Sequence, residues 1–183
     1  LLEASTEAKV VYMGIDFATG SGGDYTVLAI FNERGEQMGL HRTNNLSPMA
    51  QVDWLADLIN DYAKSYRVHR IYAEENGIGK VYVDALRKKV RAKITTWTTT
   101  SDSKQDLVTT FQIALENERV RILQDDALLD ELRRFEAVVN PTTRKVRYGG
   151  HIGTHDDCVM ATLLAYYAYE KATTTSRYSI KTL

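Results

Sequence analysis

The feature that most constrains the fold is an acidic residue at the end of an apolar run. Residues 9–17 are rich in β-branched and aromatic side chains, which predicts a β-strand, and Asp16 lies where this strand ends. A carboxylate in such a strand costs free energy unless it is paired or bound to a cation. The fold must therefore supply a partner for Asp16, unless Asp16 only begins the glycine-rich turn that follows it.

Four further acids stand at comparable points of the chain. Glu74 and Glu75 end another predicted strand, and Asp156 and Asp157 begin a predicted helix. Carboxylates that converge on one point repel one another, and a pair of divalent ions ~3.5–4 Å apart removes that repulsion. Oxygen ligands favour magnesium or manganese over zinc. We therefore predict a catalytic site in which Asp16, Glu74, Asp157 and Asp156 bind two Mg²⁺ or Mn²⁺ ions.

The choice of ligand stays open at two of these points. Glu74 and Glu75 face opposite sides of a strand, and a solvated strand end is the alternative for each of them. Asp156 and Asp157 also point in different directions on a helix. The helical face that continues from Asp157 carries small side chains such as Ala161, which would allow a close approach to the sheet. This favours Asp157 as the direct ligand, although a helix cap is the simpler interpretation of the same residue.

The remaining pattern predicts one α/β domain. Three β-runs joined by short turns come first, and alternating strands and helices follow. This order implies a mixed five-stranded sheet, with three antiparallel strands and then parallel strands, flanked by helices. The expected strands cover residues 9–17, 25–31, 37–42, 68–74 and 92–98. The expected helices cover residues 48–66, 77–90, 103–117, 126–135 and 155–171, with an extra β-hairpin over residues 136–148. We expect a single domain over residues 1–183, with an ordered core at about 8–172 and flexible tails.

Local signals refine two of these helices. Ser47 is the expected N-cap of the first helix, and Pro48 occupies its first turn. Ser103 and Asp106 are the expected capping pair of the third helix, and Leu115 is among the residues predicted to face inward.

Composition indicates a globular chain that works in a reducing environment. Hydrophobic residues make up 44% of the 183 residues and charged residues 26%, and no stretch approaches the roughly 18 apolar residues of a membrane span. The one cysteine, Cys158, excludes an internal disulfide and a zinc site of several cysteines. We expect no signal peptide, since the first residues lack a basic region before an apolar run.

The distribution of charge fits a nucleic-acid substrate better than the net charge does. The net charge is −1, but residues 87–104 hold basic residues against Asp102 alone, and residues 133–147 hold basic residues against Glu136 alone. A solvated charged surface is the alternative interpretation of each run. The basic residues that we predict to contact DNA phosphates are Lys88, Lys89, Lys104, Arg144 and Lys145.

Three motifs resemble those of a known family. In chain order they are Asp16-Phe17-Ala18-x-Gly20 with Gly23-Asp24-Tyr25, then Glu74-x-Asn76-x-x-Gly79, and then His155-Asp156-Asp157-x-Val159-x-Ala161. Together they resemble the nuclease domain of bacteriophage terminase large subunits, which belongs to the RNase H-like superfamily. The resemblance covers about residues 10–171.

The resemblance implies a Mg/Mn-dependent endodeoxyribonuclease that cuts concatemeric viral DNA during genome packaging. Two ions would hydrolyse the phosphodiester bond, one by activating a water and the other by stabilising the leaving 3′-oxygen. Asp24 maps to an auxiliary acid of the family, and His155 and Glu75 are further auxiliary candidates.

The implied partners are double-stranded DNA, an ATPase motor domain, a small terminase subunit and a portal protein, with no membrane. The implied location is the cytoplasm of the host cell. The ATPase would have to lie elsewhere, since this chain holds no Gly-x-x-x-x-Gly-Lys-Ser/Thr loop.

Three alternatives share parts of the pattern. A Holliday-junction resolvase has the same acids and metal chemistry but prefers branched DNA. A non-catalytic RNase H-like binding domain would result if one acid pointed away from the others. A phosphotransferase of the actin and sugar-kinase type begins with a similar Gly14-Ile15-Asp16 turn, but it needs two domains, and 183 residues hold about one.

Overall fold

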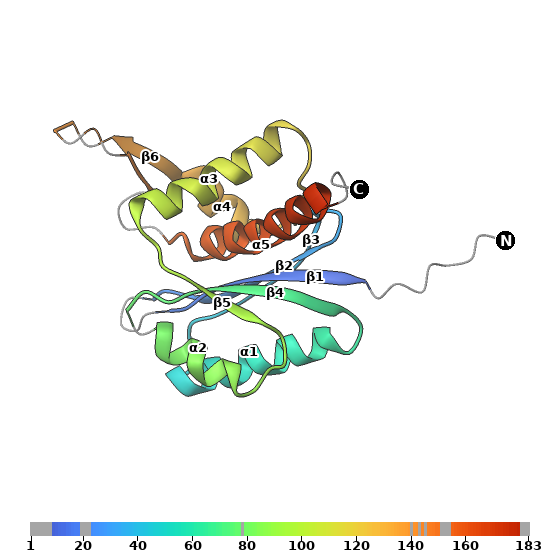
Figure 1. The fold of residues 1–183 in the computed structure, drawn as a ribbon. Helices are drawn as coiled ribbons and strands as arrows, with labels where there is room; N and C mark the ends of the chain where they lie inside the picture. The colour runs from blue at the N-terminus through green and yellow to red at the C-terminus, as the bar shows by residue number, and fades with distance from the viewer. Residues whose placement is uncertain are drawn as a thin grey trace.

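A five-stranded sheet lies between two groups of helices (Figure 1). The structure is a computed structural model that describes residues 9–18, 23–77, 79–139, 141–142, 144, 146–150 and 155–179, with side chains up to residue 174. The strands of the sheet are β1 (Val10–Asp16), β2 (Thr26–Asn32), β3 (Gln37–Thr43), β4 (Arg67–Glu74) and β5 (Ile94–Trp97). Each predicted strand of the sheet is present, with small shifts at its ends.

The order of the strands decides which residues share an edge of the sheet. The order is β3-β2-β1-β4-β5. β1 pairs antiparallel with β2, and β2 with β3, whereas β1 pairs parallel with β4, and β4 with β5. The predicted mixed sheet is therefore confirmed. Since parallel neighbours end at the same edge, β1 and β4 bring Asp16 and Glu74 to one place.

Helices cover both faces of this sheet (Figure 1). One face carries α1 (Pro48–Ala63) and α2 (Gly79–Arg87), and the other carries α3 (Ser101–Glu116), α4 (Asp126–Arg134) and α5 (Asp157–Ser179). The predicted hairpin is present as β6 (Phe135–Val139) and β7 (Val146–Gly150). The tail that we expected to be flexible from about residue 172 is helical as far as Ser179, because α5 continues through it. Within the described ranges, none of the helices has both the length and the apolarity needed to cross a bilayer.

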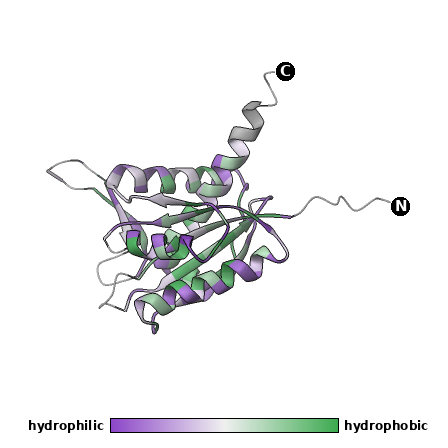
Figure 2. Cartoon of the chain, turned by 60° about the horizontal axis from the view of Figure 1, so that its bottom comes forward, coloured by the Kyte–Doolittle hydropathy of each residue, from purple (hydrophilic) through white to green (hydrophobic). Residues whose placement is uncertain are grey.

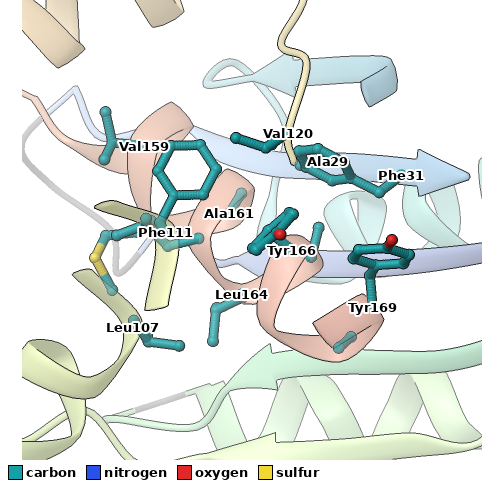
Figure 3. Packing of buried hydrophobic residues seen from close by; sticks show 14 of the residues in the cluster. Ala29, Phe31, Leu107, Phe111, Val120, Val159, Ala161, Leu164, Tyr166 and Tyr169 are labelled. Atoms are coloured by element: carbon teal, nitrogen blue, oxygen red, sulfur yellow. The ribbon is translucent and has the colours of Figure 1, made fainter. Parts of the chain in front are cut away.

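Alternation along the strands divides the core into two clusters. On β1, Tyr12 packs with residues of α5, whereas Ile15 packs with residues of α1 and α2. Figure 3 shows the first cluster, in which the ring of Tyr166 lies against those of Phe31 and Phe111. Figure 2 shows strands rich in hydrophobic residues and helices that mix both kinds. The sheet is therefore buried on both faces, as its nearly continuous apolar strands require.

A glycine in β1 lets α5 lie close against the sheet. A Cβ added to Gly14 would clash with backbone atoms of Ala161 and Ala165 in α5. Ala161 and Ala168, on the small-residue face that the sequence indicated, are fully buried. Because Asp157 lies one helical turn before Ala161, this contact also places the start of α5 near the end of β1.

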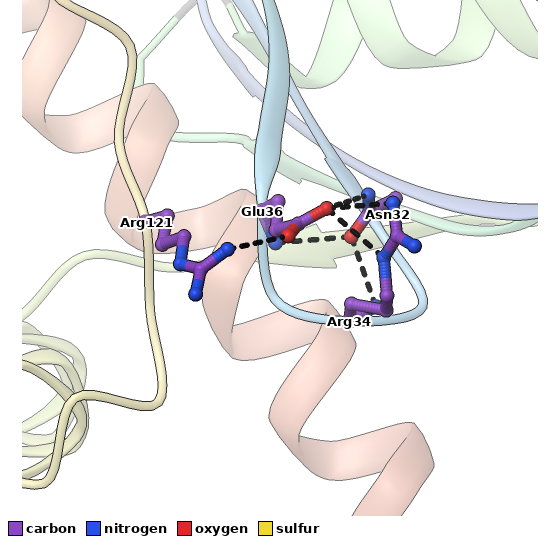
Figure 4. Close-up of polar contacts among 4 residues, drawn as sticks. All are labelled: Asn32, Arg34, Glu36 and Arg121. Carbon is purple, nitrogen blue, oxygen red and sulfur yellow. Dashed lines mark hydrogen bonds and ion pairs between the residues drawn. The ribbon is translucent and has the colours of Figure 1, made fainter.

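The turn between β2 and β3 is tied to the segment after α3, at the edge of the sheet opposite the acids. Glu36 accepts hydrogen bonds from Asn32 and Arg34 on one carboxylate oxygen and from Arg121 on the other, at 2.8, 3.0 and 3.1 Å (Figure 4). The Asn32 hydrogen bond and the nearby arginines hold the pKa of Glu36 below its usual value. Next to this cluster, Arg121 also forms an isolated parallel bridge with Glu36.

The start of α3 differs from the prediction. The helix begins at Ser101, and Thr100 is its N-cap. The Thr100 hydroxyl accepts a hydrogen bond from the N–H of Ser103 at 3.1 Å, and the Ser103 hydroxyl accepts one from the N–H of Thr100 at 2.8 Å. Ser103 is therefore the third helical residue of a capping box, and the predicted Ser103/Asp106 pair is wrong.

Two smaller details of the helices also differ. Ser47 occupies the N-cap position of α1, but its side chain makes no capping hydrogen bond. Leu115 was expected to face inward and is 46% exposed, because it lies one residue, or about 100° around the helix, beyond the buried Ala114.

We predict that Gly14→Ala destabilises the protein, because the added methyl group forces α5 away from β1. Overpacking of this kind costs roughly 1–3 kcal/mol, and each kcal/mol lowers the melting temperature of a domain of this size by roughly 2–4 °C. Gly149→Ala is the control, since a Cβ there meets its nearest neighbour at an ordinary 3.4 Å. Equal melting temperatures of the wild type and Gly14→Ala would contradict this packing.

Candidate metal centre

Three acidic side chains from different elements meet at one edge of the sheet. Asp16 ends β1, Glu74 ends β4 and Asp157 begins α5. Asp16 and Glu74 lie on the face that α5 covers, because Tyr12 and Tyr72, at alternate positions of the same strands, pack in the core cluster of that face. All three acids line one cavity of about 190 Å³.

Asp16 is buried among these carboxylates. It is 8% exposed, and Glu74 is the neighbouring acid whose charge acts on it most strongly. Burial, together with the charges of Glu74 and Asp157, raises the pKa of Asp16 well above its usual value. The fully ionised set of acids is therefore unfavourable unless a cation neutralises it.

Asp157 is held in place by the main chain just before β2. Its Oδ2 atom accepts a hydrogen bond from the N–H of Tyr25 at 2.7 Å, and its side chain is 13% exposed. Burial raises the pKa of Asp157 to about 6, while the Tyr25 N–H opposes this shift and the charge of Asp24 adds to it. In the absence of a cation, Asp157 is therefore half-protonated at about pH 6.

Asp156 lines the same cavity but is directed toward α3. The ammonium group of Lys104 donates a hydrogen bond to Asp156 Oδ2 at 2.9 Å, and both side chains are mostly buried. The charge of Asp157 raises the pKa of Asp16 more than the charge of Asp156 does. Asp157 is therefore the acid of the pair that acts more strongly on Asp16, whereas Asp156 is paired with Lys104.

Glu75 is directed away from the cavity. Its Oε1 atom accepts a hydrogen bond from the hydroxyl of Thr98 at 2.7 Å, and Glu75 is not among the residues that line the cavity. Glu74 lines the cavity. Because successive side chains of a strand point to opposite faces, only one of these two glutamates can do so.

Asn76 joins the end of β4 to the segment that leads into α3. Its side-chain amide donates to the carbonyl of Thr99 at 3.0 Å and accepts from the N–H of Thr99 at 3.1 Å. These bonds fix the approach to Lys104, which lies one helical turn later. In the sequence, Asn76 stood out only as part of a motif, and Thr99, which is 23 residues away, carried no signal.

Asp24 and His155 lie on the other side of Asp157. The Nδ1 atom of His155 is 3.4 Å from Asp24 Oδ1 and 3.7 Å from Asp157 Oδ2. One ligand atom of each residue lies within 4.8 Å of the others, so these three side chains are close enough to hold a metal ion. Asp157 is shared between this group and the Asp16–Glu74 pair.

The predicted DNA-contacting residues are not brought together. Lys104 lines the cavity. Lys88 and Lys89 follow α2, which runs from the acid edge back along the sheet, so they lie at the opposite edge, where the main chain of Lys89 contacts α1. Arg144 is exposed in the turn of the hairpin, and Lys145 lies outside the described residues. The chain reverses direction at α2 and again at β5. Basic residues that are close in the sequence, such as Lys89 and Lys104, therefore lie at opposite edges of the sheet.

Comparisons with known sequences agree on one family. The family model of the terminase RNase H-like domain matches residues 13–168. The terminase large subunit of Thermus virus P23-45 is 30% identical over 163 residues, which cover 86% of this chain and 31% of that protein. The chain therefore spans about a third of the length of the curated relatives that it matches.

Solved structures confirm the predicted RNase H-like fold. The crystal structure of the large terminase nuclease from thermophilic phage G20c has a TM-score of 0.75 and 26% identity, covering 88% of this chain and 83% of that one. The crystal structure of the same nuclease with bound magnesium also has a TM-score of 0.75 and 26% identity, covering 87% and 81%.

We predict that the metal-free protein loses stability as the pH rises through the range set by Asp157. Folding raises the pKa of this residue from 3.8 to about 6, so the folded state binds the proton more tightly than the unfolded state does. The resulting stabilisation, about 3 kcal/mol at 1.36 kcal/mol per unit, is fully present below the unfolded pKa and is lost as the pH rises through the folded one.

The melting temperatures of the wild type and Asp157→Asn in EDTA measure this effect. The asparagine resembles the protonated acid at every pH, so the variant should match the wild type near pH 4 and melt at a higher temperature at pH 7. A difference between the two proteins that stays constant over this range would exclude Asp157 as the titrating group.

Proposed function

This chain belongs to the terminase RNase H-like domain family, and we propose that it is the endonuclease domain of a terminase large subunit, which cuts concatemeric double-stranded viral DNA during genome packaging. The observation that carries this proposal is the convergence of Asp16, Glu74 and Asp157, from three different elements, on one cavity. Such a set of carboxylates suits phosphodiester hydrolysis assisted by divalent ions.

The residues at this site fit divalent cations. The carboxylates supply only oxygen ligands, which suit Mg²⁺ and Mn²⁺. Burial, together with the charges of Glu74 and Asp157, raises the pKa of Asp16, and a cation would offset both effects. The G20c nuclease, which is similar to this chain, has a solved form with bound magnesium. We infer that Asp16, Glu74 and Asp157 hold two ions, with Asp156 as a further ligand. When bound, such ions lower the pKa of an attacking water and stabilise the leaving oxygen.

Other groups of the chain position the acids and the substrate. The N–H of Tyr25 keeps Asp157 in one orientation, and Asn76 fixes the segment before α3. Lys104 lies in the cavity with its ammonium group on Asp156. It therefore reduces the repulsion between the acids and an approaching phosphate, and it is placed to contact that phosphate.

We infer that the domain works as one part of a packaging machine. The matched region is 31% of the large subunit of Thermus virus P23-45, which leaves room for a further domain in a protein of that length. The partners that we propose are an ATPase motor domain in the same polypeptide, a small terminase subunit and a portal protein, in the cytoplasm of the infected cell. Among the described residues, α1, α2 and α5 contact the five-stranded sheet and α3 and α4 contact α5, which supports our proposal of a single domain over residues 1–183.

Cleavage of supercoiled plasmid tests the nuclease and its ligands. The wild type should nick and linearise the plasmid in Mg²⁺ or Mn²⁺ and leave it intact in EDTA. Asp16→Asn and Glu74→Gln should each reduce the rate at least ~100-fold, since loss even of a residue that only supports a metal ligand typically costs 10–100-fold.

Glu75→Gln is the matched control for Glu74→Gln. It makes the same change one residue later, on a side chain that bonds to Thr98 instead of facing the cavity, so it should cut at the rate of the wild type. Loss of activity in Glu75→Gln with activity retained in Glu74→Gln would reverse the assignment of the two glutamates. A folded wild type that cuts with neither metal would refute the proposed nuclease.

A further inference from the structure

A second cavity lies beside the carboxylates, on the far side of Tyr25 and His155. Its volume is about 220 Å³, and its walls include Tyr25 and His155, Arg42 of β3 and Arg134 of α4. Pockets for drug-sized ligands usually measure roughly 300–1,000 Å³, so this cavity suits a single charged group better than a whole nucleotide. His155 separates it from the first cavity, because it also contacts Asp24 and Asp157.

Arg42 lies in the same row of the sheet as Asp16. Arg42 pairs with Val27 on β2, and Val27 pairs with Asp16 on β1. Leu40, two residues before Arg42, packs in the core cluster on the α5 side, so Arg42 and Asp16 lie on one face of the sheet. Two strand spacings separate them, which is roughly 10 Å.

Two arginines, Arg42 and Arg134, and two acids, Asp130 and Glu131, line this cavity. The guanidinium of Arg42 lies 5.5 Å from the centre of the Tyr25 ring. In the part of the chain that the structure describes, it forms no ion pair with a carboxylate. Arg134 is paired with Asp130 at 2.9 Å, but both side chains are about half exposed, and such a pair is weak enough to yield to another anion.

The remaining acid of the cavity is occupied elsewhere. Glu131 also lines the wall, but its carboxylate accepts a hydrogen bond from the N–H of Val159 at 3.1 Å, in the first turn of α5. Its negative charge therefore lies at the N-terminus of α5, where the helix dipole stabilises it. This leaves the guanidinium of Arg42 as the charge most available to a ligand, and that of Arg134 becomes available if its exposed pair with Asp130 opens.

We propose that this second cavity binds a backbone phosphate of the DNA strand that is being cut, a few nucleotides from the bond at the carboxylates. The proposal rests on the proposed function. Arginine suits the recognition of phosphate, because its planar group donates several hydrogen bonds at once. Since each strand of B-DNA advances ~3.4 Å along the helix axis per phosphate, roughly 10 Å spans at most a few nucleotides.

Tyr25 connects this phosphate site to the candidate metal centre. Its main-chain N–H fixes Asp157, and its ring forms a wall of the second cavity beneath Arg42. A strand held at Arg42 would therefore be held at a set distance from Asp157. The second cavity would position the strand and would take no part in the bond cleavage itself.

The dependence of DNA binding on salt tests this proposal without any cleavage. A fluorescent duplex would be titrated with the full chain in EDTA at several salt concentrations, for the wild type, Arg42→Gln and Arg134→Gln. Loss of one phosphate contact should make the negative slope of log K against log salt shallower by about 0.9. The affinity should fall alike for unrelated sequences, because a phosphate contact does not read bases.

Two further variants separate charge from structure. Arg42→Lys keeps the charge and should retain the slope of the wild type. Arg34→Gln removes an exposed arginine that pairs with Glu36 at the opposite edge of the sheet (Figure 4), so its slope should also be unchanged. Melting temperatures establish that each variant is folded.

Different failures of the test have different meanings. If the wild type binds and cuts DNA but Arg42→Gln and Arg134→Gln keep its slope, the phosphate site is refuted and the nuclease stands. If Arg34→Gln makes the slope as shallow as Arg42→Gln does, the loss of any positive charge has this effect, and the site is likewise refuted. A wild type that neither binds nor cuts DNA overturns the proposed function together with this site.

Discussion

The interaction on which the rest of the site depends is the contact between Asp16 and Glu74, two acids that lie side by side at the ends of parallel strands. Burial and mutual repulsion make this contact unfavourable when both are ionised. The fold keeps it because the strands are held by the core on both faces of the sheet. Gly14 then allows α5 to lie close to β1, which adds Asp157 as a third acid. The stability of the scaffold thus maintains a site that is strained without a cation.

Contacts between residues far apart in the sequence hold the segments around these acids. The Tyr25 N–H bonds to Asp157, the Asn76 amide bonds to the main chain of Thr99, and Glu131 bonds to the start of α5. Each contact joins a loop or helix end to another element, so the acids are positioned by main-chain bonds as well as by packing. Such positioning matters because a metal site depends on ligands that are held in place before the ion arrives.

The sequence predicted the parts of the structure that local pattern determines. The apolar runs and the turn residues between them were enough to predict the mixed sheet. An acid at the end of such a run, such as Asp16, can also be recognised from the sequence alone. The choice of Glu74 over Glu75 required the register of β4, and the separation of Lys89 from Lys104 required the path of α2. Glu131 gave no signal at all, because its partner is 28 residues away and contributes only a main-chain N–H.

Anomalous diffraction from crystals grown with manganese would test the central claim most directly, because it locates the ions without relying on activity. The account predicts anomalous density between Asp16, Glu74 and Asp157, and no such density in crystals of Asp16→Asn. It would be contradicted if crystals of the wild type, grown at a manganese concentration that supports cleavage, contained ions only elsewhere or none at all.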